Sequence, residues 1–583
     1  MELLSGNEAI AQGAWEAGAH IGAAYPGTPS TETMECFAQK EQVYAEWCPN
    51  EKVALEVAIG ASAAGARVLV TMKHVGVNVA ADPLFTAAYT GVGAGMLIMA
   101  ADDPGMHSSQ NEQDSRFYAL ASRIPMLEPA NSQEALDYAR ESFELSERFD
   151  VPFMIRTTVR ISHTKTPVET SVRHERAVIE YESDPTKWVM MPAFAKTRRS
   201  IQDERVDELK AWADECPFNT IIDKGSKIGV ICAGASFQHL VEALPDVNIL
   251  KLGLSWPLPK NTIIDFAESL DELYVVEEAS DYLSTQVKAL GVKLCEPPKP
   301  LPVAGELSPA SIMEAFNKEL PPHLNNCPDI PGRPPALCPG CPHRLVFKEL
   351  SRIKAIVTGD IGCYTLGALP PLSAIDTCVD MGASISMAHG FELALAQKDQ
   401  HRPIVAVIGD STFAHSGLSS LIGTVYNSGS GTIAILDNRT TAMTGRQGNP
   451  FNGLTLQNRE TRELNLEAII SALGVERVST VDPLDAKAVR AALKEATQSN
   501  KLDVIIFRSP CVLLERQRNV PVVVNDACRA CGVCVSLGCP AISTFDEEGH
   551  VTIDQGLCIG CGQCMQYCGF SAMELAYSEQ EVK

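Results

Sequence analysis

Residues 404–445 constrain the fold more tightly than any other stretch of this chain. An apolar, β-branched run, IVAVI, ends at Gly409-Asp410, and a second apolar run ends at Asp437-Asn438. The small-residue segment between the runs has the length of a crossover helix, so the stretch predicts a strand, a helix and a second, parallel strand. In a right-handed βαβ unit both strands end at one edge of the sheet, where Asp410 and Asn438 would face each other.

The side chains at this edge suit a magnesium ion next to a phosphate. Carboxylate and carboxamide oxygens are ligands for Mg²⁺, which usually shares its coordination shell with a phosphate-bearing molecule. Gly409 allows a phosphate to approach the backbone closely, and the N–H groups that follow can donate hydrogen bonds to it. The alternative is an ordinary α/β turn that carries an aspartate, and the pairing of two polar strand ends at this spacing disfavours it.

This pattern resembles the thiamine diphosphate motif, which begins with Gly-Asp-X and ends with Asn after a segment of about this length. Gly409-Asp410-Ser411 and Asn438 match the motif, with Ser411 where many relatives carry Gly. The resemblance implies that Mg²⁺ would bind Asp410, Asn438 and the backbone carbonyl of Thr440.

Two earlier glycine-containing turns, at residues 359–363 and 380–384, are expected to help build the same cofactor site. The candidate cofactor contacts in these turns are Gly362, Met381 and Gly382. By the same resemblance, Met381 or a neighbour would be the apolar support that bends thiamine into its reactive V shape.

Residues 1–165 alternate small-residue helices with apolar strands, which is the order of an α/β domain with a mainly parallel sheet. Asn50 is a good N-cap, so Glu51 is expected in the first helical turn. Taken alone, Glu51 is an ordinary helix-start carboxylate. The expected elements are helices at 7–17, 51–66 and 133–148 and strands at 68–72, 96–100 and 151–156.

The thiamine motif changes the interpretation of Glu51. Thiamine enzymes need a carboxylate from a separate pyrimidine-binding domain, and Asn50-Glu51 before an Ala/Gly-rich helix resembles that element. Glu51 would hydrogen-bond the aminopyrimidine ring and favour the imino tautomer, whose nitrogen takes the proton from thiazolium C2. His74 and His107 follow apolar strands at the ligand-binding edge and could position substrate or relay protons, although such loop histidines are more often structural.

The middle of the chain is interpreted as connecting and structural. Residues 166–225 are charged and irregular, with a polar helix at 203–215, and are expected to be a linker. A small α/β domain, similar to the transketolase C-terminal domain, is expected at 226–300 and has no evident catalytic constellation. A second, proline-rich linker follows at 301–335, before the diphosphate-binding domain at 336–520.

Residues 521–583 contain two CxxCxxC runs, each followed by a fourth cysteine. This spacing is the bacterial two-cluster ferredoxin arrangement, in which the fourth cysteine of each run binds the other cluster. Four residues rather than three precede Cys539, and Gly569 stands where the second proline is expected; both changes should alter a turn and keep every ligand. The expected ligands are Cys528, Cys531, Cys534 and Cys568 for the first 4Fe–4S cluster, and Cys558, Cys561, Cys564 and Cys539 for the second.

Zinc and disulfides are the weaker interpretations of these cysteines. Zinc sites group cysteines in pairs, often with histidine, and a disulfide scaffold belongs to small secreted proteins. A second set, Cys338, Cys341, Cys363 and Cys511, resembles positions that hold a third, cofactor-proximal cluster in several 2-oxoacid:ferredoxin oxidoreductases. The other interpretation is that CPGC is a tight turn against the cofactor, and both remain open.

Composition excludes some partners. The net charge of −24 and the pI near 5.0 argue against nucleic acid as the main partner. The N-terminal residues lack a signal peptide pattern, and no stretch of eighteen uncharged apolar residues predicts membrane insertion. A cytoplasmic protein is expected.

The two kinds of cofactor together predict a reaction. Thiamine diphosphate stabilises the carbanion left when a 2-oxo acid loses CO₂, and low-potential clusters in the same chain can oxidise that carbanion one electron at a time. The ordered segments of nearly the whole chain resemble the α subunit of the indolepyruvate:ferredoxin oxidoreductases. These segments are YPGTPSTE, WCPNEKVALEVAIGASAAGA, TMKHVGVNVAADPL, DDPGMHSSQNEQDSR, LCPGCPHR, GDIGCYTLG, GDSTFAHSG, LDNRTTAMTG and the cysteine-rich tail.

The resemblance implies oxidative decarboxylation of an aryl 2-oxo acid, first of all indole-3-pyruvate, with CoA as co-substrate and ferredoxin as electron acceptor. It also implies a smaller β subunit, an α₂β₂ heterotetramer, and a position for Thr28 near the substrate carboxylate. No convincing phosphate cradle for CoA is present, which agrees with CoA contacts on the partner. The implied fold is α/β, with two thiamine diphosphate-binding, doubly wound parallel-sheet domains, a smaller α/β domain between them, and a C-terminal two-cluster ferredoxin-like α+β domain.

Three alternatives remain open. The chain could be a non-oxidative thiamine-dependent decarboxylase or carboligase with a vestigial tail, or an electron-transfer scaffold without an active cofactor. It could also be a related oxidoreductase that acts on phenylglyoxylate or phenylpyruvate, because pocket shape, which the sequence does not reveal, decides the substrate.

Overall fold

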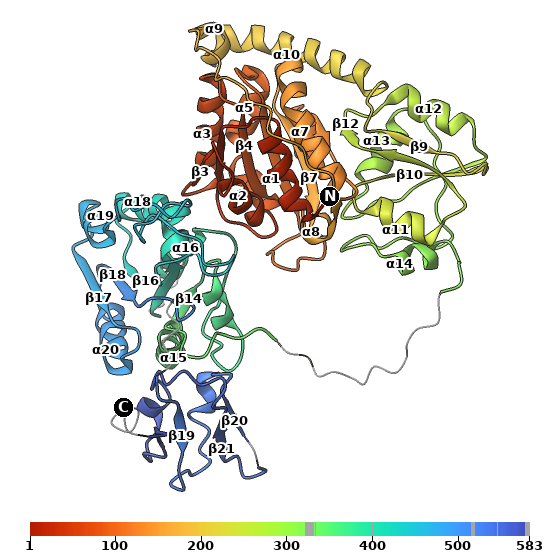
Figure 1. Cartoon of the computed structure of the whole chain (residues 1–583). Helices are drawn as coiled ribbons and strands as arrows, with labels where there is room; N and C mark the ends of the chain where they lie inside the picture. Colours follow the sequence, from red (N-terminus) through yellow and green to blue (C-terminus); the bar gives the residue numbers. More distant parts are fainter. Residues whose placement is uncertain (321–331, 333, 398–401, 515–518, 545, 578–583) are drawn as a thin grey trace. The chain divides into compact units, whose positions relative to one another are not determined.

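The computed structural model describes residues 1–320, 332, 334–397, 402–514, 519–544 and 546–577 (Figure 1). These residues form two compact units, Met1–Cys327 and Pro328–Lys583, and each is described by itself. Among the described residues, every helix is too short or too polar to cross a lipid bilayer.

The first unit is built on a seven-stranded sheet with the order β12-β6-β7-β5-β4-β2-β3, in which only β12 is antiparallel to its neighbour. Its central strands are buried along their whole length, as expected for a parallel sheet covered by helices on both faces. The strands are β2 (Ile21–Ala24), β3 (Tyr44–Trp47), β4 (Val68–Lys73), β5 (Met96–Asp102), β6 (Met126–Leu127), β7 (Phe153–Thr158) and β12 (Leu254–Trp256).

The three predicted helices are present as α1, α3 and α7, and the three predicted strands are present as β4, β5 and β7. The helices α1 and α7 pack closely together, because Gly13 of α1 has no side chain and lies against the Leu136 carbonyl of α7. The helices are α1 (Gly6–Glu16), α2 (Thr31–Ala38), α3 (Glu51–Ala63), α4 (His74–Val79), α5 (Ala81–Thr90), α6 (Arg116–Ser122), α7 (Ser132–Phe149) and α8 (Val159–His163).

Residues 166–225 differ from the predicted linker. The polar helix expected at 203–215 begins earlier, as α10 (Pro192–Ala213), and packs against α5 and α7. Two of its arginines are buried: Arg198 donates from Nη2 to the Thr90 carbonyl at 2.8 Å, at the end of α5, and Arg205 pairs with Asp150. In the sequence these charged side chains suggest a segment exposed to solvent. In the structure they bind carbonyls at the C-terminus of a helix, where cations are favoured.

A smaller sheet follows with the order β13-β10-β11-β9, parallel except for β9. The short strand β12 from this region joins the first sheet, so the two sheets belong to one unit. The elements are β9 (Thr220–Ile222), β10 (Ile228–Ala233), β11 (Asn248–Leu252), β13 (Glu272–Val275), α11 (Ser236–Ala243), α12 (Lys260–Glu268), α13 (Tyr282–Ala289) and α14 (Pro309–Ala315). The strands β1 (Glu2–Ser5) and β8 (Lys165–Val168) form a separate two-stranded antiparallel sheet, and the short helix α9 (Pro185–Trp188) precedes α10.

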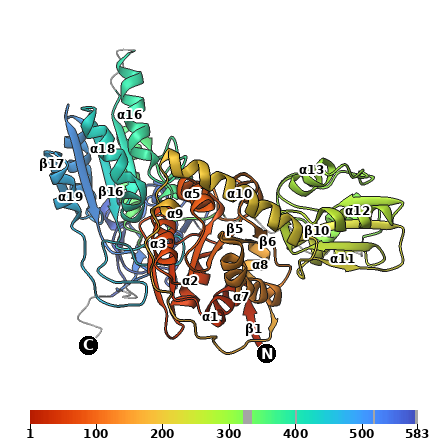
Figure 2. The same ribbon diagram turned by 90° about the horizontal axis from the view of Figure 1, so that it is seen from above.

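The second unit is built on a five-stranded, fully parallel sheet with the order β14-β15-β16-β18-β17. Alternate residues of β15 enter two cores, Val405 and Val407 on one face and Ala406 and Ile408 on the other. The helices α16 and α18 pack together on the second face (Figure 2). The strands are β14 (Ile356–Thr358), β15 (Ile404–Gly409), β16 (Gly431–Asp437), β17 (Arg477–Val481) and β18 (Leu502–Arg508), and the helices are α15 (His343–Ile353), α16 (Ala383–Ala396), α17 (Asp410–Thr412), α18 (Leu418–Tyr426), α19 (Leu466–Ala472) and α20 (Ala486–Thr497).

The connection between β15 and β16 confirms the predicted strand, helix and parallel strand, with one difference. The single crossover helix is interrupted by a π-helical stretch, Phe413–Gly417, between α17 and α18. Such interruptions occur frequently at functional sites.

The tail contains two small antiparallel strand pairs and packs on the diphosphate domain. Leu345 of α15 and Ala486 of α20 belong to the same buried cluster as Cys534 and Cys564 of the tail. The paired strands are β19 (Val522–Val524) with β22 (Met573–Leu575), and β20 (Ile542–Thr544) with β21 (Val551–Ile553).

Candidate functional site

The β15–β16 register brings the two polar strand ends to one edge of the sheet. Gly409 pairs with Leu436, so Asp410 and Asp437 leave the sheet side by side. Asp410 is only 2% exposed; it accepts hydrogen bonds from the Ser411 N–H and from Asn449 Nδ2, both at 2.9 Å. Burial first, and then the nearby Asp437, raises the pKa of Asp410 to about 7. A divalent cation beside Asp410 would remove this penalty.

The loop after β16 lies against the same carboxylate. Thr441 Oγ1 bonds Ser411 Oγ at 2.8 Å, which ties the loops after the two strands together. Asn438 is buried, and its Nδ2 lies 3.4 Å from Nε2 of His343. Burial lowers the pKa of His343 to about 4, so the ring is neutral at neutral pH and can accept from this amide.

The Thr440 N–H donates to Asn438 Oδ1 at 3.2 Å, and Thr440 Oγ1 donates to the Gln447 carbonyl at 3.0 Å. The predicted magnesium ligands Asp410, Asn438 and Thr440 therefore lie on two adjoining, hydrogen-bonded loops. A buried carboxylate, a carboxamide and a carbonyl in such a place have the chemistry that Mg²⁺ requires.

Asp360 holds the other glycine-containing turns in place. Its carboxylate accepts from the N–H groups of Ile361 at 2.8 Å, Gly382 at 2.9 Å and Ser384 at 3.0 Å. Burial raises the pKa of Asp360 to about 6. Gly382 has a φ of +92° and lies directly against Ser416 of the π-helical stretch, so only glycine fits there. Asp360 thus ties the turns that carry Gly362, Met381 and Gly382 to one another.

In the first unit, α3 begins as predicted. Asn50 Oδ1 accepts from the Val53 N–H at 2.9 Å, which confirms the N-cap. Glu51 follows and is buried, and its carboxylate packs against Gly76 of α4. A Cβ atom added at Gly76 would lie 2.7 Å from Glu51 Oε1, so the Glu51 side chain is tightly packed against Gly76.

One basic residue at the end of β4, Lys73, lies near this glutamate. Lys73 is buried, and its ammonium donates to the Ser108 carbonyl at 3.1 Å. Burial lowers the pKa of Lys73, and the charges of Asp103 and Glu51 oppose that change. The Lys73 side chain also packs against Gly27, where a Cβ atom would lie 3.2 Å from Lys73 Cγ, so it adjoins the half-buried Thr28 turn.

The two predicted histidines have different surroundings. His74 is buried, with Nε2 3.1 Å from the Asn111 carbonyl and no partner for Nδ1 among the described residues. Burial lowers the pKa of His74, which favours the neutral ring. The side chain of His107 is 56% exposed and pairs with Glu306 at 3.3 Å. An exposed ion pair accounts for His107 structurally, so His74 is the stronger candidate.

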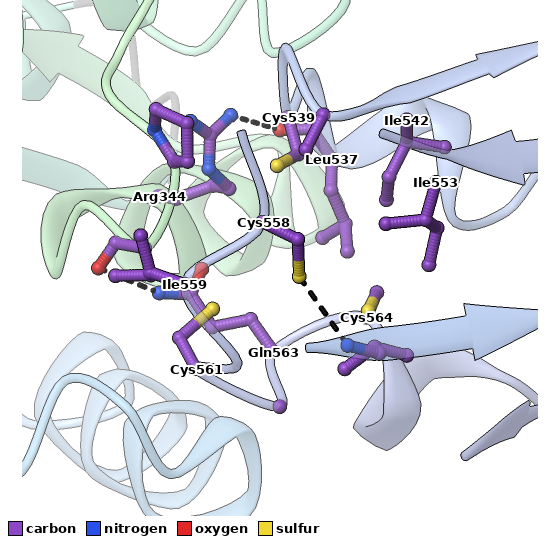
Figure 3. Close-up of a pocket in the computed structure, with 15 residues that line it drawn as sticks. Arg344, Leu537, Cys539, Ile542, Ile553, Cys558, Ile559, Cys561, Gln563 and Cys564 are labelled. Carbon is purple, nitrogen blue, oxygen red and sulfur yellow. Dashed lines mark hydrogen bonds between the residues drawn. The ribbon is translucent and has the colours of Figure 1, made fainter. Parts of the chain in front are cut away.

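Four cysteines of the tail line one cavity, and they are the four predicted for the second cluster (Figure 3). Burial and the neighbouring thiols raise the pKa of Cys564 to about 12. Thiols crowded in this way suit a metal centre that binds them as thiolates. The cavity cysteines are Cys539, Cys558, Cys561 and Cys564.

The remaining tail cysteines are also close together. Burial raises the pKa of Cys534, and Cys531 and Cys528 contribute to the rise. Cys568 Sγ accepts from the Ala572 N–H at 3.2 Å. Cys534 belongs to the tail core, Cys528 and Cys568 pack against it, and Cys531 is exposed.

The third set of cysteines adjoins the diphosphate edge. Burial raises the pKa of Cys363 to about 11, and the nearby Cys511 and Cys338 add to the rise. The Cys511 N–H donates to the Asn438 carbonyl at 3.0 Å. Cys341 closes a tight turn by donating to the Cys338 carbonyl at 3.1 Å. Both interpretations of CPGC, as a turn and as cluster ligands, therefore remain open.

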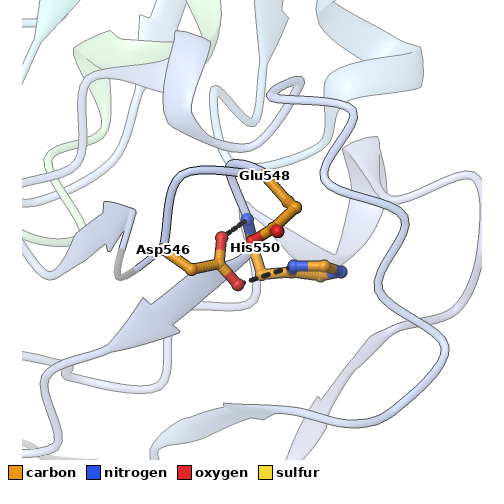
Figure 4. Close-up of side chains that lie close together, drawn as sticks. All are labelled: Asp546, Glu548 and His550. Atoms are coloured by element: carbon orange, nitrogen blue, oxygen red, sulfur yellow. Dashed lines mark hydrogen bonds and ion pairs between the residues drawn. The ribbon is translucent and has the colours of Figure 1, made fainter.

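Asp546, Glu548 and His550 form a separate cluster on the loop between β20 and β21 (Figure 4). Asp546 accepts from the His550 N–H at 2.7 Å, and Asp546 Oδ2 lies 2.7 Å from the ring Nδ1. These contacts explain why Asp546 and His550 lie close together.

Sequence reasoning missed several of these residues. Asn449 and His343 were given no place in the expected site, and Asp360 and Lys73 lie in expected polar stretches but were given no role. Asp360 could have been found, because Gly359-Asp360 repeats the Gly-Asp pair of Gly409-Asp410. Asn449 and His343 carry no such signal, since only the fold brings them to Asp410 and Asn438.

Four protein families match successive parts of the chain. Residues 12–208 match the family described as pyruvate flavodoxin/ferredoxin oxidoreductase, thiamine diP-bdg, and residues 219–290 match the indolepyruvate oxidoreductase domain. Residues 360–507 match the thiamine pyrophosphate enzyme, C-terminal TPP binding domain, and residues 551–574 match the 4Fe-4S binding domain. These matches confirm the predicted fold class and the combination of thiamine diphosphate with iron–sulfur chemistry.

Curated relatives match almost the full length. The chain is 40% identical to the indolepyruvate oxidoreductase subunit IorA of Thermococcus kodakarensis, over 98% of this chain and 96% of that protein. It is 40% identical to the subunit of the same name from Methanothermobacter marburgensis, over 98% and 97%. The corresponding subunit of Archaeoglobus fulgidus is 38% identical over 99% and 98%.

Proposed function

Since this chain belongs to the family of indolepyruvate oxidoreductase IorA subunits, we propose that it oxidatively decarboxylates an aryl 2-oxo acid, first of all indole-3-pyruvate. CoA would be the co-substrate, and the products would be the aryl-acetyl-CoA and CO₂. Electrons would leave through 4Fe–4S clusters to ferredoxin.

One observation carries this proposal: the second unit combines the Asp410 edge with a cysteine-lined cavity. The segment from the CPGC turn to His343 connects them, because His343 contacts Asn438 on one side. On the other side, Gln563 of the tail donates to the carbonyls of Gly340 and Cys341 at 3.2 and 3.1 Å. A decarboxylase with a vestigial tail has no need for this continuous packing.

Residues of this chain would hold the cofactor and control protons around it. Asp410, Asn438 and the Thr440 carbonyl would bind Mg²⁺ and through it the diphosphate, with Gly409 and Ser411 at the phosphate. When bound, thiamine diphosphate supplies a sink for the electrons left as CO₂ departs. Glu51, buried against Gly76, would hold a proton at the aminopyrimidine ring and return it.

Substrate contacts would come from the first unit. Thr28 is half-buried in the turn that packs against Lys73, which suits contact with a substrate carboxylate. The neutral ring of His74 can accept or donate one hydrogen bond at Nδ1, so it is suited to orienting substrate. His107 would serve the same edge more remotely.

The tail would bind two clusters, with Cys528, Cys531, Cys534 and Cys568 on one and Cys539, Cys558, Cys561 and Cys564 on the other. Two clusters predict about eight iron atoms per chain, and a third at Cys338, Cys341, Cys363 and Cys511 predicts about twelve. Iron analysis therefore decides the third site.

The proposal includes a smaller β subunit, an α₂β₂ heterotetramer and the functional division of the chain. That division assigns 1–165 to pyrimidine binding, 226–300 to a structural domain, 336–520 to diphosphate binding and 521–583 to electron transfer. The helix α10 within 166–225 would brace the first of these domains, since it packs on α5 and α7.

The test is anaerobic purification with the β subunit, followed by a panel of 2-oxo acids in the presence of CoA. Reduction of ferredoxin or viologen by aryl 2-oxo acids, with acyl-CoA formation, is the expected result. Release of free aldehyde without reduction would support the non-oxidative decarboxylase instead. Failure of the anaerobic protein to bind thiamine diphosphate with Mg²⁺ would leave only the scaffold interpretation.

A further inference from the structure

Arg344 is a buried cation beside the cysteine-lined cavity. It lies in the first turn of α15, directly after the CPGCP segment, and is 1% exposed. Its side chain lines the cavity together with Cys539 and Cys561 (Figure 3). The backbone of Gly538, the residue before Cys539, is also close to Arg344. A Cβ atom added at Gly538 would lie 3.6 Å from Arg344 Nη1.

All hydrogen bonds of this guanidinium go to uncharged acceptors. Nη1 donates to the Leu537 carbonyl at 2.8 Å, and Nη2 donates to the carbonyls of Leu337 and Cys338 at 2.7 and 2.8 Å. Nε is buried and has no hydrogen-bond partner within the described part of the chain. No ion pair of Arg344 with a carboxylate is found among the described residues either.

A buried charge without a counter-ion is costly, by several kcal/mol in proteins. The other large buried arginines avoid this cost: Arg116 pairs with Asp114 at 2.6 Å, and Arg156 pairs with Asp102 at 2.6 Å. The charges that can balance Arg344 are the thiolates of the cavity.

We propose that Arg344 is a positioning residue that raises the reduction potential of the cluster bound by Cys539, Cys558, Cys561 and Cys564. The inference rests on the ligand set of the proposed function. A cluster bound by four thiolates is anionic, and its reduction by one electron adds one more negative charge. A fixed cation beside it stabilises the reduced form more than the oxidised form, because charge and hydrogen bonding around a cluster set its potential.

The position of Arg344 relates this shift in reduction potential to electron transfer. Gly340 of the CPGC turn lies against Ile559, and a Cβ atom at Gly340 would be 3.5 Å from Cys561 Cβ. The cavity therefore adjoins the CPGC turn. A cation here favours arrival of each electron at the cluster beside this turn.

The competing explanation is that Arg344 only fastens the tail to the CPGC turn through its three carbonyl contacts. Arg344→Lys keeps the charge and loses most of this geometry, whereas Arg344→Met loses both. Arg477→Met is the matched control: it removes the same charge from β17, where Arg477 is 39% exposed and pairs with Asp503 at 2.5 Å.

The experiment is an EPR-monitored redox titration of the anaerobic full-length proteins, with iron counted in each. We expect Arg344→Met to shift the midpoint potential of one cluster to more negative values and to leave the other unchanged, while Arg344→Lys and Arg477→Met remain near wild type. Loss of one cluster in Arg344→Met with wild-type potentials in Arg344→Lys also supports the charge effect.

Unchanged potentials in Arg344→Met with full iron content would overturn the proposal, and so would equal shifts or equal iron loss in the Met and Lys variants. These outcomes are separable from failure of the proposed function. If the proposed function were wrong, the wild-type protein itself would give no EPR signals from clusters or would not reduce ferredoxin.

Discussion

Replacing Asp410 with Asn should stabilise the metal-free protein at pH 8, although it removes the main proposed Mg²⁺ ligand. Burial and Asp437 raise the pKa of Asp410 from its ordinary value of 3.8 to about 7. That difference corresponds to a destabilisation of about 4 kcal/mol when the carboxylate is ionised in the folded state. Asn cannot ionise, so the variant does not carry this cost.

The substitution also removes an acceptor. Asp410 accepts from Ser411 and Asn449, and a single amide oxygen cannot replace both carboxylate oxygens. Loss of one such hydrogen bond costs about 1 kcal/mol, which leaves a net gain of about 3 kcal/mol at pH 8.

The sign of the pH dependence follows from the raised pKa. Between 3.8 and about 7 the folded protein holds a proton on Asp410 that the unfolded chain releases, so the wild type loses stability as the pH rises through this range. The advantage of the Asn variant should therefore fall to less than about 1 kcal/mol at pH 5.

The assay is scanning calorimetry of the metal-free proteins at both pH values, with hydrogen exchange of residues 404–445 to identify the relevant transition. Mg²⁺ with thiamine diphosphate should raise the melting temperature of the wild type and not that of the variant. An Asn variant that is no more stable than wild type at pH 8, or equally stabilised at pH 5 and pH 8, would refute the reasoning.

Three further predictions test other parts of the molecule. Glu51→Gln should lower turnover by about 10²–10⁴-fold and leave the cluster content unchanged. Gly76→Ala should lower turnover similarly, because its Cβ atom would press on the Glu51 carboxylate. Steady-state rates with iron analysis test both variants, and normal turnover in Glu51→Gln would contradict the assignment. Cys561→Ala should remove iron without changing the thermal shift caused by thiamine diphosphate, and an unchanged iron content would show that Cys561 is not a ligand. Trp212→Ala should destabilise the first unit by about 3–5 kcal/mol, because this buried side chain of α10 packs on Phe149 and Phe153. Chemical denaturation measures this, and a curve equal to that of the wild type would mean that α10 is only a connector.

The sequence predicted the elements with strong periodicity and the residues with fixed spacing. The strand before Gly409, the helix after Asn50 and the four cavity cysteines were found this way, because their signals lie within short stretches of chain. The helix α10 was predicted too short, because buried arginines that bind carbonyls resemble surface arginines in a sequence.

The sequence signals could not predict contacts between segments that are far apart in the chain. Asn449 follows Asp410 by 39 positions and His343 precedes Asn438 by 95, so no local pattern connects them. The same holds for Arg344, whose partners include a carbonyl 193 positions away.

The buried charges of the second unit suggest why its two ends bind different groups. At the edge that carries Asp410, burial raises the pKa of the two acids Asp360 and Asp410 above the ordinary range, whereas the buried Asp437 pairs with Arg508 at 2.6 Å. Such an edge is stabilised by a cation, and Mg²⁺ would bring the anionic diphosphate with it. At the tail the buried ionisable group beside the cysteines is a cation, Arg344, and it is stabilised by an anionic cluster. Buried acids at one site and a buried cation at the other thus favour cofactors of opposite charge, and each cofactor should stabilise this unit independently of the other.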